Sequence, residues 1–137
     1  MTQPAILINL QRCTGCWTCS LACKVGNALP EDEWWQHVRT IGSGSGVDEP
    51  AGTWPNLSLG WMPIHSSDCT LCGERVDQGL EPYCSYNCPT KAMTFGDMDD
   101  AQSPLRLRLD ELKAKGYRVF SLPVWEHSRP EILYAEK

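Results

Sequence analysis

The cysteines are the residues of this chain whose type and spacing could do chemistry. All eight fall into two runs, and each run has a C-x2-C pair followed by a C-x3-C pair. The runs are Cys13, Cys16, Cys19 and Cys23, then Cys69, Cys72, Cys84 and Cys88. Soft thiolates that converge from several sides suit a cubane of iron and sulfide. The runs therefore predict two [4Fe–4S] clusters and a role in moving electrons.

The spacing also predicts which thiolates share a cluster. Two intervening residues let one tight loop present successive thiolates to one small object, whereas three amount to about one helical turn. In two-cluster ferredoxins the last cysteine of such a run ligates the other cluster. We therefore expect cluster I to be held by Cys13, Cys16, Cys19 and Cys88, and cluster II by Cys69, Cys72, Cys84 and Cys23. One departure from the simple ferredoxin run is that proline follows only Cys88, while Lys24 follows the first run.

Two other uses of eight cysteines compete with iron. An even number in a small secreted chain would indicate a disulfide scaffold. Here residues 1–4 carry no basic region and the apolar stretch 5–10 is too short for a signal peptide, so we expect a cytoplasmic protein, without excluding export with a signal-bearing partner. CxxC pairs also bind zinc. Four cysteines within the eleven residues 13–23 are, however, unusually dense for a zinc site.

Composition indicates one compact domain. The chain has 137 residues and a net charge of −5, which argues against a nucleic-acid partner. No apolar stretch approaches the roughly 20 residues that a membrane helix needs. Because much of the interior between the runs would be inorganic, we expect folding to be coupled to cluster binding.

The coarse pattern of the sequence predicts an α+β chain. Strands are expected over residues 5–10, 34–41, 61–65, 92–95 and 117–122, and short helices over 20–26 and 70–78. Residues 104–115 form an amphipathic helix whose apolar residues are Leu105, Leu107, Leu109 and Leu112. Residues 42–60 are loop-like. The tail from Pro123 contains apolar residues but has no helical or strand period.

The two runs form an internal repeat, which predicts a ferredoxin-like dicluster core with a pseudo-two-fold axis. Residues 1–137 make a single domain, with a cluster core of about 5–28 and 61–96. An insertion occupies residues 29–60. The remaining residues 97–137 supply a helix, a strand and an arm that would dock on another chain, because its apolar side chains are hard to bury in a small core.

The chain resembles the iron–sulfur electron-transfer subunits of the dimethyl sulfoxide reductase family of molybdenum or tungsten pterin enzymes. The matching segments are residues 12–16, 22–24, 27–31 with Trp34 and Trp35, 68–72, 79–84, 88–92, 95–97 with Asp99, Asp100 and Ser103, and 129–134. Typical members carry four clusters and sixteen cysteines, so this chain is similar to a shortened form.

The resemblance implies a non-catalytic subunit with no catalytic residue of its own. It would relay electrons between a redox donor or acceptor, which could be soluble, and a large molybdenum or tungsten pterin catalytic subunit. A stand-alone soluble ferredoxin with two [4Fe–4S] clusters is the alternative, and a zinc-binding interaction module is a third class. Residues 29–64 and 97–137 exceed what two clusters need, which favours a docked subunit.

Several residues near the runs have two readings. Arg12, Lys24 and Lys91 lie within three residues of a cysteine and would either raise a cluster potential or be solvated charges. The tryptophans at 34, 35, 54 and 61 would either shield a cluster or form a partner interface. The aspartates at 97, 99 and 100 favour a solvated turn over a cation site, and His37, His65 and His127 are expected to be ordinary surface or core residues.

Overall fold

The computed structural model describes residues 3–41, 50–66, 68–121 and 132–137 of the chain. The helices are α1 (Thr18–Gly26), α2 (Gly73–Asp77), α3 (Tyr83–Asn87) and α4 (Pro104–Ala114). The strands are β1 (Pro4–Asn9), β2 (Gln36–Ile41), β3 (Ala51–Thr53), β4 (Asn56–Ser58), β5 (Gly60–His65), β6 (Met93–Asp97), β7 (Arg118–Phe120) and β8 (Ile132–Glu136). This mixture confirms the α+β prediction.

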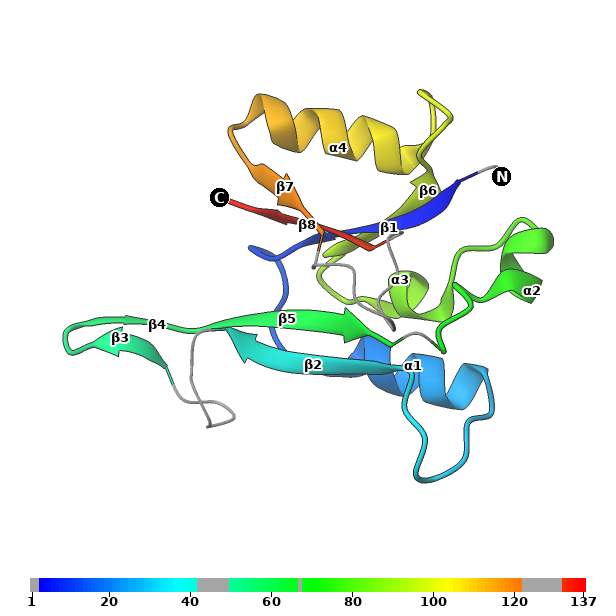
Figure 1. Ribbon diagram of the computed structural model, residues 1–137, viewed down its shortest axis with the longest axis horizontal. Coiled ribbons are helices and arrows are strands. Elements are labelled where there is room, and N and C mark those ends of the chain that lie inside the picture. The colour runs from blue at the N-terminus through cyan, green and yellow to red at the C-terminus, as the bar shows by residue number, and fades with distance from the viewer. Residues whose placement is uncertain (1–2, 42–49, 67, 122–131) are drawn as a thin grey trace.

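A four-stranded sheet in the order β6-β1-β8-β7 forms one layer, and α4 covers one of its faces (Figure 1). Strand β1 is antiparallel to β6 and parallel to β8. Its side chains alternate between the faces, so Leu7 packs with α4 while Ile6 and Ile8 face the cysteine-bearing side. Both faces of this sheet are therefore covered by protein.

Helix α4 is positioned by its first turn. Ser103 caps the helix by accepting a hydrogen bond from the backbone N–H of Arg106 at 3.3 Å, and Pro104 occupies the first turn. The leucines that this helix buries against the sheet are Leu105, Leu109 and Leu112. Leu107, the other apolar residue named for this predicted helix, is 53% exposed and lies off the buried face.

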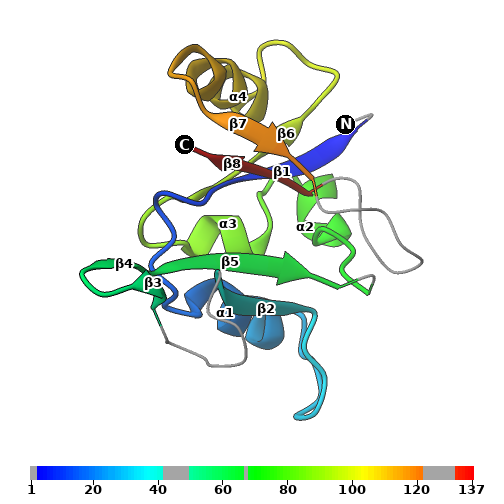
Figure 2. The same ribbon diagram turned by 60° about the vertical axis from the view of Figure 1, so that its left-hand side comes forward.

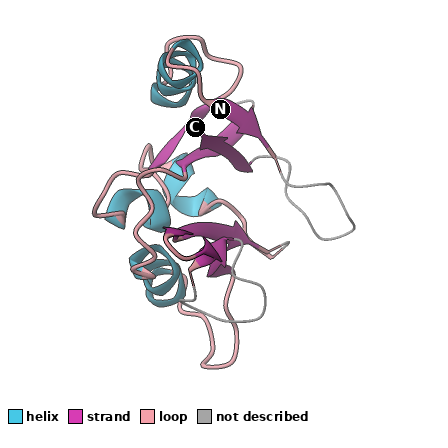
Figure 3. Cartoon of the chain, turned by 90° about the vertical axis from the view of Figure 1, so that its left-hand side faces the viewer, coloured by secondary structure: helices cyan, strands magenta, loops and turns pink. Residues whose placement is uncertain are grey.

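A second layer is the antiparallel ribbon of β2 and β5, with α1 beside it (Figure 2). Helices α1 and α3 pack against one another, and Figure 3 shows helices above, below and between the two layers of strands. The short hairpin of β3 and β4 extends the ribbon, and it lies in the stretch predicted to be loop. The cysteine loops thus lie between two layers of strands.

The predicted docking arm is wrong for its described part. Residues Ile132–Glu136 form β8, a central strand between β1 and β7. Ile132, Tyr134 and Ala135 are buried in the core. Residues 123–131 of the predicted arm lie outside the described residues. A strand covered on both faces carries apolar residues without alternation, which is why the pattern did not indicate one.

Two smaller differences concern the second cysteine run. The helix predicted over 70–78 is only the five residues of α2. Helix α3 was not predicted; it brings Cys84 into the core and ends just before Cys88. Within the described ranges no helix is long and apolar enough to cross a membrane.

Candidate metal centres

The first cysteine loop is bent by backbone in the left-handed region. Gly15 has φ +70°, and Trp17, the residue just before α1, has φ 64°. A Cβ atom on Gly15 would lie 2.6 Å from the ring of Trp61, so only glycine lets this ring cover the loop. The loop therefore turns back on itself between Cys13 and Cys19 and presents its thiols to one side.

Four thiols line one cavity between the strand layers. They are Cys13, Cys16, Cys19 and Cys88, and the other lining residues are Thr14, Trp17, Val38, Pro63, Pro89, Thr90, Ala92 and Met93. Electrostatic repulsion from Cys88 and Cys16 contributes to raising the pKa of Cys13, after the larger effect of burial. The last cysteine of the second run thus joins the first three of the first run.

The remaining four thiols form a second group, which consists of Cys23, Cys69, Cys72 and Cys84. The side-chain amide nitrogen of Asn27 lies 3.6 Å from Cys23 Sγ and 3.8 Å from Cys72 Sγ, which joins the two runs. Burial raises the pKa of Cys84 well above its usual value, and repulsion from Cys69, Cys72, Cys19 and Cys23 adds to it. Cys19, of the first group, is therefore also near Cys84, as expected for adjacent sites.

Backbone N–H groups point at sulfur in both groups. The N–H of Leu71 donates to Cys69 Sγ at 3.4 Å, and that of Ala92 donates to Cys88 Sγ at 3.3 Å. Donors of this kind stabilise thiolates and metal-bound sulfur. Converging thiols, a cavity lined by four of them, and N–H donors make a set that fits two [4Fe–4S] clusters.

Burial opposes thiolate formation in the metal-free chain. It raises the pKa of Cys19 to about 12 and that of Cys23 to about 11. These thiols are protonated at neutral pH until a metal replaces the proton. Cys16 differs because it is exposed, and a hydrogen bond with the Thr18 side chain lowers its pKa. Cys16 is the most accessible thiol of the first group.

Two buried polar residues of the β2–β5 ribbon had no distinguishing sequence signal. The buried His65 has its Nε2 atom 3.9 Å from Cys84 Sγ. Gln36, directly opposite His65 across the ribbon, is also buried. A histidine at the end of an ordinary strand was expected to be a surface or core residue, and the cysteine contact could only be found from the fold.

The charged residues near the runs have defined contacts. Lys24 Nζ donates to the carbonyl oxygens of Pro30, Glu31 and Glu33, the last two at 3.0 and 2.7 Å. It also lies 4.5 Å from the ring centre of Trp34. Lys24 thus fastens the loop after α1 to the helix. The effect of Lys24, and of Arg12 and Lys91, on a cluster potential stays a prediction.

The tryptophans divide by exposure. Trp34 packs edge-on against Trp17 at 6.4 Å between ring centres, and Trp61 lies against Gly15, so these rings cover the first cysteine loop. Trp54, at the turn of the β3–β4 hairpin, is 83% exposed. Shielding of a cluster therefore suits the partly buried Trp34 and Trp61, and an interface with a partner suits the exposed Trp54.

The aspartates after β6 organise a turn. Asp97 Oδ1 accepts from the backbone N–H groups of Gln3 and Asp99, at 3.1 and 3.0 Å. Asp100 Oδ1 accepts from that of Gln102 at 2.9 Å. Side-chain oxygens bound to nearby backbone N–H groups are typical of turns, so these contacts agree with the predicted turn.

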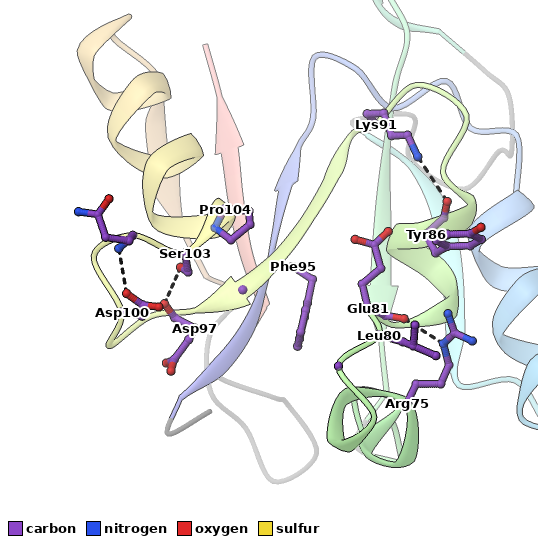
Figure 4. Close-up of a pocket in the computed structure, with 13 residues that line it drawn as sticks. Arg75, Leu80, Glu81, Tyr86, Lys91, Phe95, Asp97, Asp100, Ser103 and Pro104 are labelled. Atoms are coloured by element: carbon purple, nitrogen blue, oxygen red, sulfur yellow. Dashed lines mark hydrogen bonds between the residues drawn. The ribbon is translucent and has the colours of Figure 1, made fainter.

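A second, more open cavity lies between α2, α3 and the turn that joins β6 to α4 (Figure 4). Its lining includes the cations Arg75 and Lys91 and the acids Asp97 and Asp100. Both cations have internal partners: Arg75 donates to the Glu81 carbonyl at 2.9 Å, and Lys91 to a carbonyl of α3 at 3.4 Å. No described cysteine lines this cavity, so it is separate from both thiol groups.

Comparison with known proteins agrees with the cysteine arrangement. Residues 59–98 match the family described as a 4Fe-4S dicluster domain. The chain is 32% identical over 96 residues to a dimethyl sulfoxide reductase iron–sulfur subunit of Halobacterium salinarum, covering 70% of this chain and 32% of that protein. It is 30% identical over 120 residues to the arsenate respiratory reductase iron–sulfur subunit of a Shewanella species, covering 71% of this chain and 50% of that protein.

A third relative is the beta subunit of a formate dehydrogenase from Megalodesulfovibrio gigas, 44% identical over 46 residues that cover 34% of this chain and 21% of that protein. The chain thus spans a third to a half of the length of the first two relatives. These findings confirm two [4Fe–4S] clusters as the cofactors. They also confirm the resemblance to iron–sulfur subunits of the dimethyl sulfoxide reductase family.

Proposed function

We propose that this chain is a non-catalytic electron-transfer subunit that relays electrons between a redox donor or acceptor and a molybdenum or tungsten pterin catalytic subunit. The observation that carries the proposal is the pair of adjacent thiol groups, one lining a cavity and the other joined through Asn27. The names of its relatives, which are subunits of reductases and a dehydrogenase, support it.

In the proposed ligand assignment, cluster I is held by Cys13, Cys16, Cys19 and Cys88, and cluster II by Cys23, Cys69, Cys72 and Cys84. A [4Fe–4S] cluster supplies a site that takes up and releases single electrons. The protein holds the sulfur ligands, limits water at the buried cysteines and leaves Cys16 exposed. That exposure makes the first group the natural side for exchange with an external partner.

The proposed core has pseudo-two-fold symmetry. One half is β1, the first cysteine loop, α1 and β2; the other is β5, the second cysteine loop, α3 and β6. Exchanging the halves converts the β1–β6 pair into β5–β2, and both pairs are antiparallel. The contact between α1 and α3 would lie on the axis. The same exchange places Cys23 and Cys88 in equivalent positions, each serving the other half's cluster.

We propose the β3–β4 hairpin as the part of the tryptophan-rich segment that contacts the catalytic subunit. Trp54 is 83% exposed, and the nearby Leu57 and Leu59 are 44% and 42% exposed. Exposed apolar side chains close together in the sequence, on a hairpin and directly after it, are typical of interaction sites. We expect Trp54→Ala to weaken binding of the partner, while Leu107→Ala, an exposed leucine on α4, leaves it unchanged.

The test is anaerobic purification of the chain from its native host, followed by identification of bound proteins and measurement of iron, molybdenum and tungsten. The proposal predicts about eight irons per chain and a stoichiometric catalytic subunit that contains molybdenum or tungsten. A monomeric chain with eight irons would instead favour the stand-alone ferredoxin, and stoichiometric zinc without iron would favour the binding module. The cytoplasmic location stays a prediction that fractionation of the host would check.

A further inference from the structure

We propose that the side chains of Gln36 and His65 donate hydrogen bonds to the sulfur atoms of cluster II and its ligands, and that these bonds raise the reduction potential of the cluster. The inference rests on the proposed assignment of Cys23, Cys69, Cys72 and Cys84 to that cluster. The side chains of Gln36 and His65 lie outside the cysteine runs, and neither needs a charge to donate a hydrogen bond. They would act on the cluster through its sulfur atoms.

Gln36 and His65 are directly opposite one another in the β2–β5 ribbon, and Val38 and Pro63 are the next pair on the same face. Val38 and Pro63 line the cavity of the first thiol group. The same face of the ribbon therefore offers an apolar pair to cluster I and a polar pair two residues further along.

His65 contacts one of the cysteines assigned to cluster II. Its Nε2 atom lies 3.9 Å from the sulfur of Cys84, within reach of a hydrogen bond to sulfur, and both residues are buried. A cysteine bound to iron has no S–H hydrogen, so its sulfur can only accept. The contact therefore requires the hydrogen to be on Nε2, and His65 donates to the ligand sulfur.

Gln36 carries a buried side-chain amide. Its side chain is 1% exposed, and neither its amide nitrogen nor its amide oxygen has a hydrogen-bond partner within the described residues. A buried amide without a partner is costly, and such a group commonly serves a ligand or water that completes its bonding. Ser20, which follows Cys19, donates to the backbone carbonyl of Gln36 and so fixes this residue beside α1.

Hydrogen bonds to sulfur tune the reduction potential of a cluster. Reduction adds negative charge to the cluster and its ligand sulfurs, so a donor to sulfur stabilises the reduced state more than the oxidised one. Asn27, which lies against Cys23 and Cys72, adds another donor to the same thiol group. Gln36 and His65 are positioning residues that tune a potential; neither is a ligand to iron.

The experiment is a redox titration of the anaerobically purified full chain, followed by electron paramagnetic resonance, with iron and sulfide measured on the same samples. In His65→Leu we expect one of the two midpoint potentials to fall by ~59 mV. For a one-electron couple this lowers the ratio of reduced to oxidised cluster about tenfold at a fixed solution potential. Gln36→Met should lower the same potential. His65→Gln keeps an N–H donor and should restore most of the shift.

Two comparisons keep the test specific. His37→Leu removes an exposed histidine from β2 whose ring lies 6.4 Å from that of Trp17, beside the first thiol group, and should leave the potential that His65→Leu lowers unchanged. Asn27→Leu should lower the same potential as His65→Leu. Two results would overturn the inference and leave the proposed function standing. One is eight irons with unchanged potentials in His65→Leu and Gln36→Met, and the other is a fall in His65→Gln as large as that in His65→Leu. An unmodified chain without eight irons would overturn the proposed function and the inference together.

Discussion

Tyr134 donates its phenolic hydrogen to the backbone carbonyl oxygen of Pro63 at 2.6 Å. The bond joins β8 in the four-stranded sheet to β5 in the ribbon, across the space into which the cysteine loops fold. Pro63 also lines the cavity of the first thiol group. One hydrogen bond therefore connects the C-terminal strand to a wall of the proposed cluster I site.

Tyr134→Phe should destabilise the protein, because it leaves the buried Pro63 carbonyl without this donor. The expected loss is about 1–3 kcal/mol in the free energy of unfolding. The measurement is the anaerobic denaturation midpoint, followed through cluster absorbance. Tyr86→Phe, at an exposed position on α3, is the matched control and should change little. Equal midpoints for Tyr134→Phe and the unmodified chain would show that the bond contributes nothing to stability.

Deleting residues 132–137 should abolish cluster retention. These residues include β8, which lies between β1 and β7, so its loss leaves the backbone edges of both neighbours unpaired and removes the buried Ile132, Tyr134 and Ala135 from the core. This expectation is the opposite of the one that an external docking arm would give. Iron content and visible absorbance after anaerobic purification decide between them. Removing Lys137 alone, an exposed terminal residue, is the control, and full iron content in the longer deletion would contradict the strand assignment.

Gly26→Ala should destabilise the contact between the helices. A Cβ atom at Gly26 would lie 2.5 Å from the ring of Tyr83, at the start of α3, so either the ring or the helices must shift. Overpacking of this kind costs about 1–3 kcal/mol. Gly73→Ala is the matched control, because a Cβ atom at Gly73 meets nothing within 4 Å in the folded protein. The alanine also reduces the conformational freedom of the unfolded chain, which favours folding. Thermal midpoints should fall for the first variant and stay level or rise for the second.

Lys24→Met should loosen the loop of residues 28–35 rather than remove a cluster. The methionine keeps much of the apolar stem but loses the donors to the carbonyl oxygens of Pro30, Glu31 and Glu33. We expect faster hydrogen exchange in that loop and a loss of about 1–3 kcal/mol in stability, with iron content unchanged. Arg39→Met, an exposed cation on β2, provides the comparison. Unchanged exchange rates in Lys24→Met would contradict the fastening role.

The cysteine runs carried most of what could be predicted. Their spacing led to the two thiol groups, and strands were found where apolar residues alternate or cluster, as in β1 and β5. Strand β8 was missed because it is covered on both faces and needs no alternation. Helix α3 was missed because five residues after a proline give too little pattern. The approach of His65 to Cys84 joins two residues 19 positions apart and depends on the fold, which no local sequence signal contains.

The central claim is that the runs exchange their last cysteines between two clusters. The most direct test is an experimental structure of the anaerobically purified chain, with iron located by anomalous scattering. The account predicts two four-iron clusters, with Cys23 Sγ bonded to the cluster of Cys69, Cys72 and Cys84, and Cys88 Sγ bonded to the cluster of Cys13, Cys16 and Cys19. A bond from Cys23 to the same cluster as Cys13, or single zinc ions in place of iron, would contradict it.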